Sequence, residues 1–337
     1  MFHWNKRENR TCGRILSALS CSVLLVFSLV FQTVALAEAD LQTPWAPDAY
    51  EIHLLLNSDL ILDENHLLTQ EYLDLFDARN TYKTFSLAYY ETKERDFFEE
   101  GWINRIRLKY EEDDENDFKL TYKKRYPIQD KDLLSAIFLS QNEGFNLLDG
   151  SWEPEIDWGY TGMTLSLSSE TSIPADTEET IADLHPEEGF SMMAENMPVE
   201  EQNWKDDGWG TLTFESAEMA GPIFFNRYKG NYLDRSVTVE IWEIHDERDD
   251  TVHYLSELSF KADDYLDASS CRKMMMDALL DLGILLKVDS LKTQQMLDAY
   301  LVSPKFQDSV HPGSSSCPWS PSDNLMSSQQ IALLSIC

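Results

Sequence analysis

Two segments of the chain, WINRIRLKY at residues 102–110 and FKLTYKKRY at residues 118–126, alternate basic and apolar side chains along most of their length. This two-residue period is typical of strands, and the acidic run at 111–117 predicts a hairpin turn between them. The basic side chains would share one face of the hairpin: Arg105, Arg107, Lys109, Lys119, Lys123 and Arg125. Like charges across paired strands are destabilising unless water or a counter-anion relieves them. The face is therefore either solvated or, because it lacks acidic partners, the wall of a basic concavity.

The rest of the chain is strongly acidic. Its 337 residues include 60 Asp and Glu against 27 Lys and Arg, which gives a formal net charge of −33 at pH 7. A negative field of this size repels polyanions, so we expect neither nucleic acid nor an anionic membrane surface as a partner. The hydrophobic content of 43% excludes wholesale disorder and is enough for the core of a large domain.

Three regions are expected along the chain. Residues 1–37 have a basic start, an apolar middle and the small-x-small exit Ala35-Leu36-Ala37, which is the pattern of a secretory signal peptide. An uncleaved membrane anchor is the alternative. We therefore expect an exported protein, periplasmic or secreted, that leaves the membrane once the signal is cleaved. Residues 38–301 are predicted to form a single domain with a divergent insertion at about 145–220, and the Ser- and Pro-rich residues 302–337 a disordered tail.

Several short motifs around the basic hairpin resemble the CYTH domain of triphosphate tunnel metalloenzymes. They are Tyr89-Tyr90-Glu91-Thr92, Phe97-Phe98, Gly101, Arg105-Ile106-Arg107 and Leu120-Thr121-Tyr122-Lys123. The similarity covers about residues 50–128 and, more loosely, 221–283. The resemblance implies an α+β fold, an antiparallel eight-stranded CYTH-like tunnel barrel with flanking helices.

The same resemblance implies a site inside the tunnel. By motif position, Arg105, Arg107 and Lys123 would bind phosphate, with Arg227 on a later strand as a fourth ligand. Glu51 and Glu257 would hold Mg²⁺ or Mn²⁺, hard cations that prefer carboxylate oxygens. Guanidinium groups give bidentate phosphate contacts and an ammonium supplies a point charge, so this set suits a phosphorylated anion.

The chain also departs from the pattern of the family. The family places Glu, Glu and Lys at alternate positions of its first strand, where this sequence has Glu51, His53 and Leu55. On the last strand, alternating Glu residues are reduced to Glu257, followed by Ser259 and Lys261. One carboxylate remains on each strand, which puts a two-metal hydrolase site in doubt while leaving the anion-binding part intact.

Three functions are compatible with these residues. The first is an exported CYTH-like protein that binds phosphorylated anions, tripolyphosphate or organic phosphates, and hydrolyses them with a divalent metal. The second is a non-catalytic periplasmic binding or interaction module on a degenerate CYTH fold. The third is a tunnel for an uncharged ligand, with the basic face merely solvated. The partner in the first two cases is a small phosphorylated anion.

Overall fold

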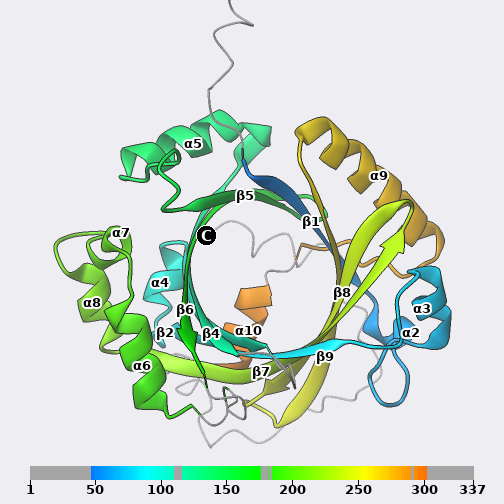
Figure 1. Ribbon diagram of the computed structural model, residues 1–337, viewed down its shortest axis with the longest axis horizontal. Coiled ribbons are helices and arrows are strands. Elements are labelled where there is room, and N and C mark those ends of the chain that lie inside the picture. Colours follow the sequence, from blue (N-terminus) through cyan, green and yellow to red (C-terminus); the bar gives the residue numbers. More distant parts are fainter. Residues whose placement is uncertain (1–46, 110–115, 176–180, 182–183, 290–291, 302–337) are drawn as a thin grey trace, which may run out of the picture. The chain divides into compact units, whose positions relative to one another are not determined.

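The computed structural model of the protein describes residues 47–109, 116–175, 181, 184–289 and 292–301. The expected signal peptide at 1–37 and tail at 302–337 lie outside these residues. Within the described part of the chain, strands close into one barrel in the order β1-β5-β6-β4-β3-β2-β7-β8-β9 (Figure 1). The strands are β1 (Ala49–Leu56), β2 (Lys83–Glu91), β3 (Trp102–Lys109), β4 (Asp117–Pro127), β5 (Glu153–Trp158), β6 (Met163–Pro174), β7 (Glu218–Tyr232), β8 (Arg235–Asp246) and β9 (Thr251–Ala262). The predicted tunnel barrel is therefore confirmed.

The barrel differs from the prediction in two details. It has nine described strands instead of eight, and β1 pairs with β5 in parallel, with Glu51 opposite Asp157, while the other pairs are antiparallel. Both β5 and β6 come from the region 145–220, which was expected to be an insertion. The strand β5 has only six residues and contains Pro154 among its acidic side chains, so its local sequence indicates a strand weakly.

The predicted hairpin of β3 and β4 is present in antiparallel register, with Arg107 opposite Lys119 and Ile106 opposite Leu120. Its apolar face points outward into a core in which Ile106, Leu108 and Leu120 are fully buried. Because side chains alternate along a strand, burying this face outside the barrel turns the basic face into the tunnel.

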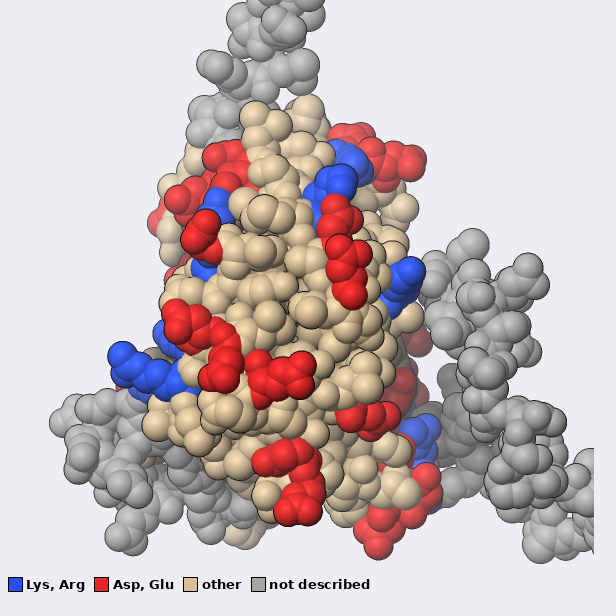
Figure 2. All heavy atoms as spheres, turned by 90° about the vertical axis from the view of Figure 1, so that its right-hand side faces the viewer, with Lys and Arg blue, Asp and Glu red and all other residues tan. Residues whose placement is uncertain are grey.

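Helices cover the outside of the barrel (Figure 1). They are α2 (Ser58–Ile61), α3 (Gln70–Leu75), α4 (Asp96–Glu99), α5 (Leu133–Asn142), α6 (Pro186–Glu195), α7 (Val199–Gln202), α8 (Trp209–Phe214) and α9 (Tyr265–Asp281), with a short 3₁₀ turn at Gln129–Lys131. Figure 2 shows Asp and Glu side chains spread over the face at the right of Figure 1. None of the described helices has the length and apolar character needed to span a membrane.

Two of the motif residues have structural roles next to the hairpin. The carboxylate of Glu91 accepts hydrogen bonds from the backbone N–H groups of Thr92, Phe97 and Phe98, which fixes the turn into α4. Gly101 has φ +78°, and a Cβ at this position would lie 2.8 Å from the carbonyl oxygen of Arg125. Only glycine fits this close approach without strain, which explains its place directly before β3.

The last helix, α10 (Lys292–Tyr300), lies within the ring of strands in Figure 1. Its apolar side chains Met296, Leu297 and Ala299 pack in a second core with the inward side chains of one end of the barrel. These inward side chains are Leu55, Phe85, Leu87, Tyr89, Ile103, Ala220, Ile223, Phe225, Trp242, Ile244 and Leu255. The helix therefore fills the apolar end of the tunnel and leaves the charged part as a cavity.

A buried carboxyl under the outer helices leads to a first prediction. Glu201 in α7 is 0% exposed, and burial, with a smaller effect of Glu91, raises its pKa to about 8. Because this value lies above that of the unfolded chain, ionising Glu201 costs stability as the pH rises from about 4.5 to 8. We expect Glu201→Gln to raise the free energy of unfolding by about 1–3 kcal/mol at pH 8 and to have little effect at pH 4.5.

Urea unfolding at both pH values measures this difference. Glu195→Gln, a change at an exposed position of α6, is the control and should have no pH-dependent effect. An equal gain for Glu201→Gln at both pH values would contradict the role assigned to the buried charge.

Candidate functional site

The barrel encloses a cavity of about 540 Å³, lined by inward side chains of all nine described strands and of α10. This volume is in the range of small-molecule sites. The predicted site residues all line it: Arg105, Arg107, Lys123, Arg227, Glu51 and Glu257. The structure thus brings the predicted set together in one cavity, while the binding role of each residue stays a prediction.

The charge of the cavity is least balanced at Arg105 and Arg107, here called the β3 arginines. Among the described residues, neither forms an ion pair with a carboxylate. The buried Nε of Arg105 has no hydrogen-bond partner there, and its Nη2 contacts only the hydroxyl of Thr121, at 3.4 Å. Burial and the neighbouring guanidinium groups of Arg105 and Arg227 lower the pKa of Arg107 to about 10. The two side chains therefore present positive charge to the cavity that no direct ion pair among the described residues neutralises, and Glu170 and Glu240 offset it only in part.

The other two predicted phosphate ligands are already paired. Lys123 Nζ lies 3.1 Å from Asp157 Oδ2. Arg227 Nη2 and Nε lie 2.6 and 2.8 Å from Glu240 Oε1, and its guanidinium stacks 4.6 Å from the ring centre of Phe85. An anion that enters the cavity would therefore find Arg227 and Lys123 held in place by carboxylates.

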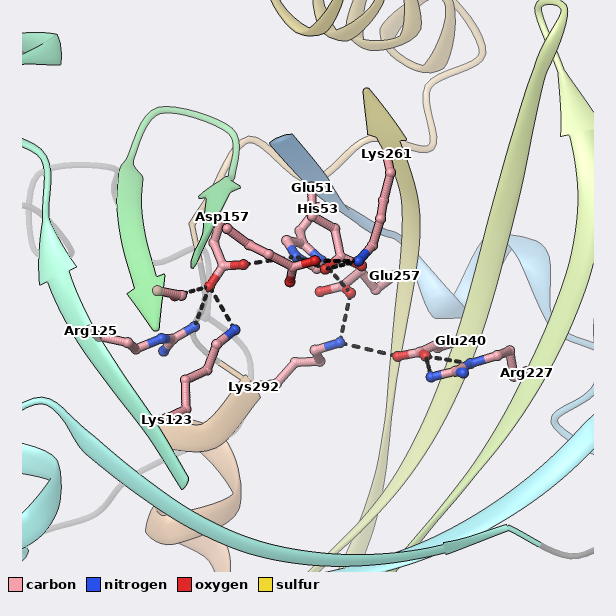
Figure 3. Close-up of polar contacts among 12 residues, drawn as sticks. Glu51, His53, Lys123, Arg125, Asp157, Arg227, Glu240, Glu257, Lys261 and Lys292 are labelled. Carbon is pink, nitrogen blue, oxygen red and sulfur yellow. Dashed lines mark hydrogen bonds and ion pairs between the residues drawn. The ribbon is translucent and has the colours of Figure 1, made fainter. Parts of the chain in front are cut away.

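His53 stands between the two predicted metal ligands (Figure 3). Its Nδ1 lies 3.0 Å from Glu257 Oε1, and its Nε2 lies 3.8 Å from both Glu51 Oε2 and Asp157 Oδ1. Burial alone would lower the pKa of the imidazole, but the carboxylates of Glu257 and Glu51 raise it to about 10. Glu51 and Glu257 are thus separated by an imidazole and do not converge on a shared point.

A second internal cation comes from α10. Lys292 Nζ lies 2.7 Å from Glu257 Oε1 and 3.1 Å from Glu240 Oε2, so one ammonium bridges two carboxylates of β8 and β9 (Figure 3). The side chains of Glu240 and Glu257 are only 7% and 4% exposed. Although burial opposes it, Lys292 and Arg227 lower the pKa of Glu240 to about 2. The carboxylates on this side of the cavity are therefore neutralised by side chains of the protein itself.

Two residues of the site, Asp157 and Lys292, were not among the predicted ligands. Asp157 belongs to the alternating acids Glu153, Glu155 and Asp157, a two-residue period that could have indicated an inward acidic strand. Lys292 has no such signal, because nothing in a short helical segment near residue 300 shows that it enters the barrel.

Comparisons with known proteins give matches among solved structures. No protein-family model matches the chain, and no curated protein matches it in sequence. A Hippeastrum adenylyl cyclase candidate with a dominant triphosphatase activity is 15% identical, with a TM-score of 0.44 over 75% of this chain and 96% of that chain. An adenylate cyclase candidate from Bacillus halodurans is 11% identical, with a TM-score of 0.43 over 74% and 97%. The PH1819 protein of Pyrococcus horikoshii is 15% identical, with a TM-score of 0.37 over 73% and 98%.

The closed barrel, its inward basic hairpin and the motifs around β3 agree with the fold that the sequence resemblance implies. The barrel is a CYTH-like tunnel. With TM-scores below 0.5 the neighbours carry no argument, and the chemistry of this tunnel has to be argued from its own side chains.

The CYTH-like tunnel is divided by charge. One wall, formed by β3 and β4, carries arginines without a direct ion pair among the described residues, and the opposite wall, formed by β1, β8 and β9, carries carboxylates bridged by His53 and Lys292. A ligand held between these walls would place its anionic groups on the first and meet a nearly neutral hydrogen-bonding surface on the second. The site is thus equipped to bind and orient an anion.

Proposed function

We propose that the CYTH-like tunnel binds a small phosphorylated anion, tripolyphosphate or an organic phosphate, and that the protein does this after export, as residues 1–37 lead us to expect. The observation that carries the proposal is the pair of β3 arginines, half-buried in a cavity without a direct ion pair to a carboxylate among the described residues. A chain of phosphates supplies several anionic oxygens, which guanidinium groups bind in bidentate fashion. Such a ligand would relieve the repulsion between the arginines.

Hydrolysis of the anion is the finer form of this proposal. Phosphoryl transfer needs the charge on the phosphate oxygens to be neutralised and a water molecule to be aligned with the phosphorus atom. The β3 arginines can do the first. The carboxylates that could orient water, Glu240 and Glu257, are engaged by Arg227, His53 and Lys292. This engagement favours a binding module, so we propose binding as the main activity and hydrolysis as dependent on a bound divalent metal.

Titration calorimetry of the purified protein with tripolyphosphate in EDTA tests the proposal. We expect one molecule to bind per chain without added metal, and orthophosphate to bind at least about tenfold more weakly because it reaches fewer donors. Release of phosphate after addition of Mg²⁺ or Mn²⁺ would establish hydrolysis, and its absence would favour the binding module. If no phosphate compound binds or raises the unfolding temperature, the proposed function is wrong.

A further inference from the structure

We propose that Glu51, His53 and Asp157 form a site for a divalent transition-metal ion, in place of the pair Glu51 and Glu257 expected from the family resemblance. The three side chains point toward one another at the edge of the cavity (Figure 3). The proposal concerns the metal alone and does not depend on which anion the tunnel binds. Its failure can therefore be told apart from a failure of the proposed function.

The parallel pairing of β1 and β5 creates the site. Its register sets Glu51 directly opposite Asp157, and His53 follows two residues later on the same inward face of β1. One ligand atom from each of the three residues lies within 4.8 Å of the others. An ion bound at about 2.0–2.2 Å by carboxylate oxygens and an imidazole nitrogen holds its ligands roughly 3–4 Å apart. The spacing therefore needs only small side-chain movements.

His53 is oriented as a metal ligand. Its Nδ1 lies 3.0 Å from Glu257 Oε1, so this nitrogen donates its proton to the carboxylate and the other nitrogen, Nε2, faces Glu51 and Asp157. Metal-binding histidines in proteins commonly donate their second ring N–H to a carboxylate in this way, which fixes the ring and its tautomer. Glu257 is held in turn by Lys292. The carboxylate expected to bind metal is thus placed behind the imidazole as an orienting group.

Asp157 supplies an acceptor that the protein leaves without a partner. The residue is only 9% exposed. Its Oδ2 accepts hydrogen bonds from Lys123 Nζ and Ser166 Oγ and lies 3.5 Å from Arg125 Nη2. Its Oδ1 is buried and has no hydrogen-bond partner among the described residues. A buried acceptor without a hydrogen-bond partner lowers the stability of the fold by about 1–3 kcal/mol, and a cation bound at Oδ1 would remove this penalty.

A metal ion would take the place of a proton on His53, because the carboxylates of Glu257 and Glu51 raise the pKa of the imidazole to about 10. Glu51 Oε2 and Asp157 Oδ1 are both 3.8 Å from Nε2, beyond hydrogen-bond distance, so an ion that replaces the Nε2 proton breaks no hydrogen bond. Separations of 3.8 Å also fall within the roughly 3–4 Å that separate two ligands of one ion. The imidazole nitrogen favours Zn²⁺, Mn²⁺ or Co²⁺ over Mg²⁺, which prefers oxygen ligands and keeps its water.

Cobalt absorption spectroscopy tests the site. The purified protein, freed of metal with EDTA and transferred to mildly alkaline buffer, is titrated with Co²⁺ in the absence of phosphate. We expect visible absorption bands that saturate at one ion per chain, that Zn²⁺ abolishes and that excess Mg²⁺ leaves unchanged. His53→Gln should weaken binding by on the order of 100-fold or more, and Glu257→Gln, which removes only the orienting group, by about 10- to 100-fold.

The protein contains a matched control at the turn between β8 and β9, where Asp246, Asp249 and His253 also form an acid and histidine group, exposed on two of its three members. His253→Gln should leave the spectrum unchanged. Glu51→Gln, at a side chain that is 24% exposed, is the second ligand variant in case His53→Gln unfolds. The proposal is overturned if the protein gives no saturable cobalt spectrum, or if His53→Gln and Glu51→Gln, both folded by circular dichroism, bind Co²⁺ as the unmodified protein does.

Discussion

Replacing both β3 arginines with glutamine is expected to weaken tripolyphosphate binding by about 10²- to 10⁴-fold. Each lost hydrogen bond between a guanidinium and a phosphate oxygen is worth about 1.5–3 kcal/mol, and the two losses together give this range. The same substitution should not destabilise the empty protein. Arg107 lies close enough to Arg105 and Arg227 for their charges to lower its pKa, so removing two of the three relieves repulsion.

The opposite signs of these two effects separate a ligand role from a structural one. Calorimetry measures the affinity of Arg105→Gln/Arg107→Gln, and urea unfolding measures its stability. Lys119→Gln is the control, because Lys119 lies on the same face of the hairpin but is paired with Glu170 and 38% exposed. It should change the affinity less than about tenfold. An affinity of the double variant within about threefold of the unmodified protein would show that the anion, if bound, lies elsewhere.

The basic wall of the tunnel could be predicted because it follows from local sequence. Alternation along β3 assigns Arg105 and Arg107 to one face, and the apolar residues between them, such as Ile106, have to be buried on the other. The same period correctly puts Glu240 and Glu243 on opposite faces of β8, with Glu240 in the cavity and Glu243 exposed. Period-two patterns therefore carry the orientation of each side chain, once the strand itself is recognised.

The partners of these side chains could not be predicted, because they depend on contacts between distant segments. Asp157 reaches His53 through the parallel pairing of β5 with β1, strands about a hundred residues apart whose register is set by the closure of the barrel. The sequence shows that His53 and Leu55 stand where the family has charged residues, but it does not show which side chain compensates for the lost charges. In the structure an ammonium from α10, Lys292, performs that role at Glu257.

This arrangement connects the fold to the chemistry of the site. The apolar side of α10 fills one end of the barrel, while Lys292 in its first turn faces the charged cavity. The position of the helix thus determines the charge balance of β8 and β9. Any movement of α10 out of the barrel would expose Glu240 and Glu257 without their cation. The same helix position therefore closes the end of the tunnel and neutralises its acidic wall.

Replacing Lys292 with methionine is accordingly expected to lower the free energy of unfolding by about 3–5 kcal/mol at neutral pH. The change keeps the aliphatic stem but leaves two almost fully buried carboxylates without the cation they share, and breaking a buried ion pair from one side has a cost of this size. Arg227 remains paired with Glu240 and His53 with Glu257, so we expect a loss at the lower end of this range.

The pH dependence and two further variants make the prediction specific to charge. In the unmodified protein the lowered pKa of Glu240, about 2, stabilises the fold above pH 4.5, and this contribution is lost as the pH falls toward 2. In Lys292→Met the pKa values of Glu240 and Glu257 rise, so the deficit should shrink as the pH falls from 7 to 4. Adding Glu240→Gln and Glu257→Gln should restore part of the stability at pH 7, because it removes the two buried charges that Lys292 neutralised, although Arg227 and His53 then lose these partners. Lys273→Met, at a side chain that is 77% exposed in α9, should change stability by less than about 0.5 kcal/mol. A pH-independent loss that the two glutamines fail to repair would instead assign Lys292 a packing role and leave the acidic wall balanced by other groups.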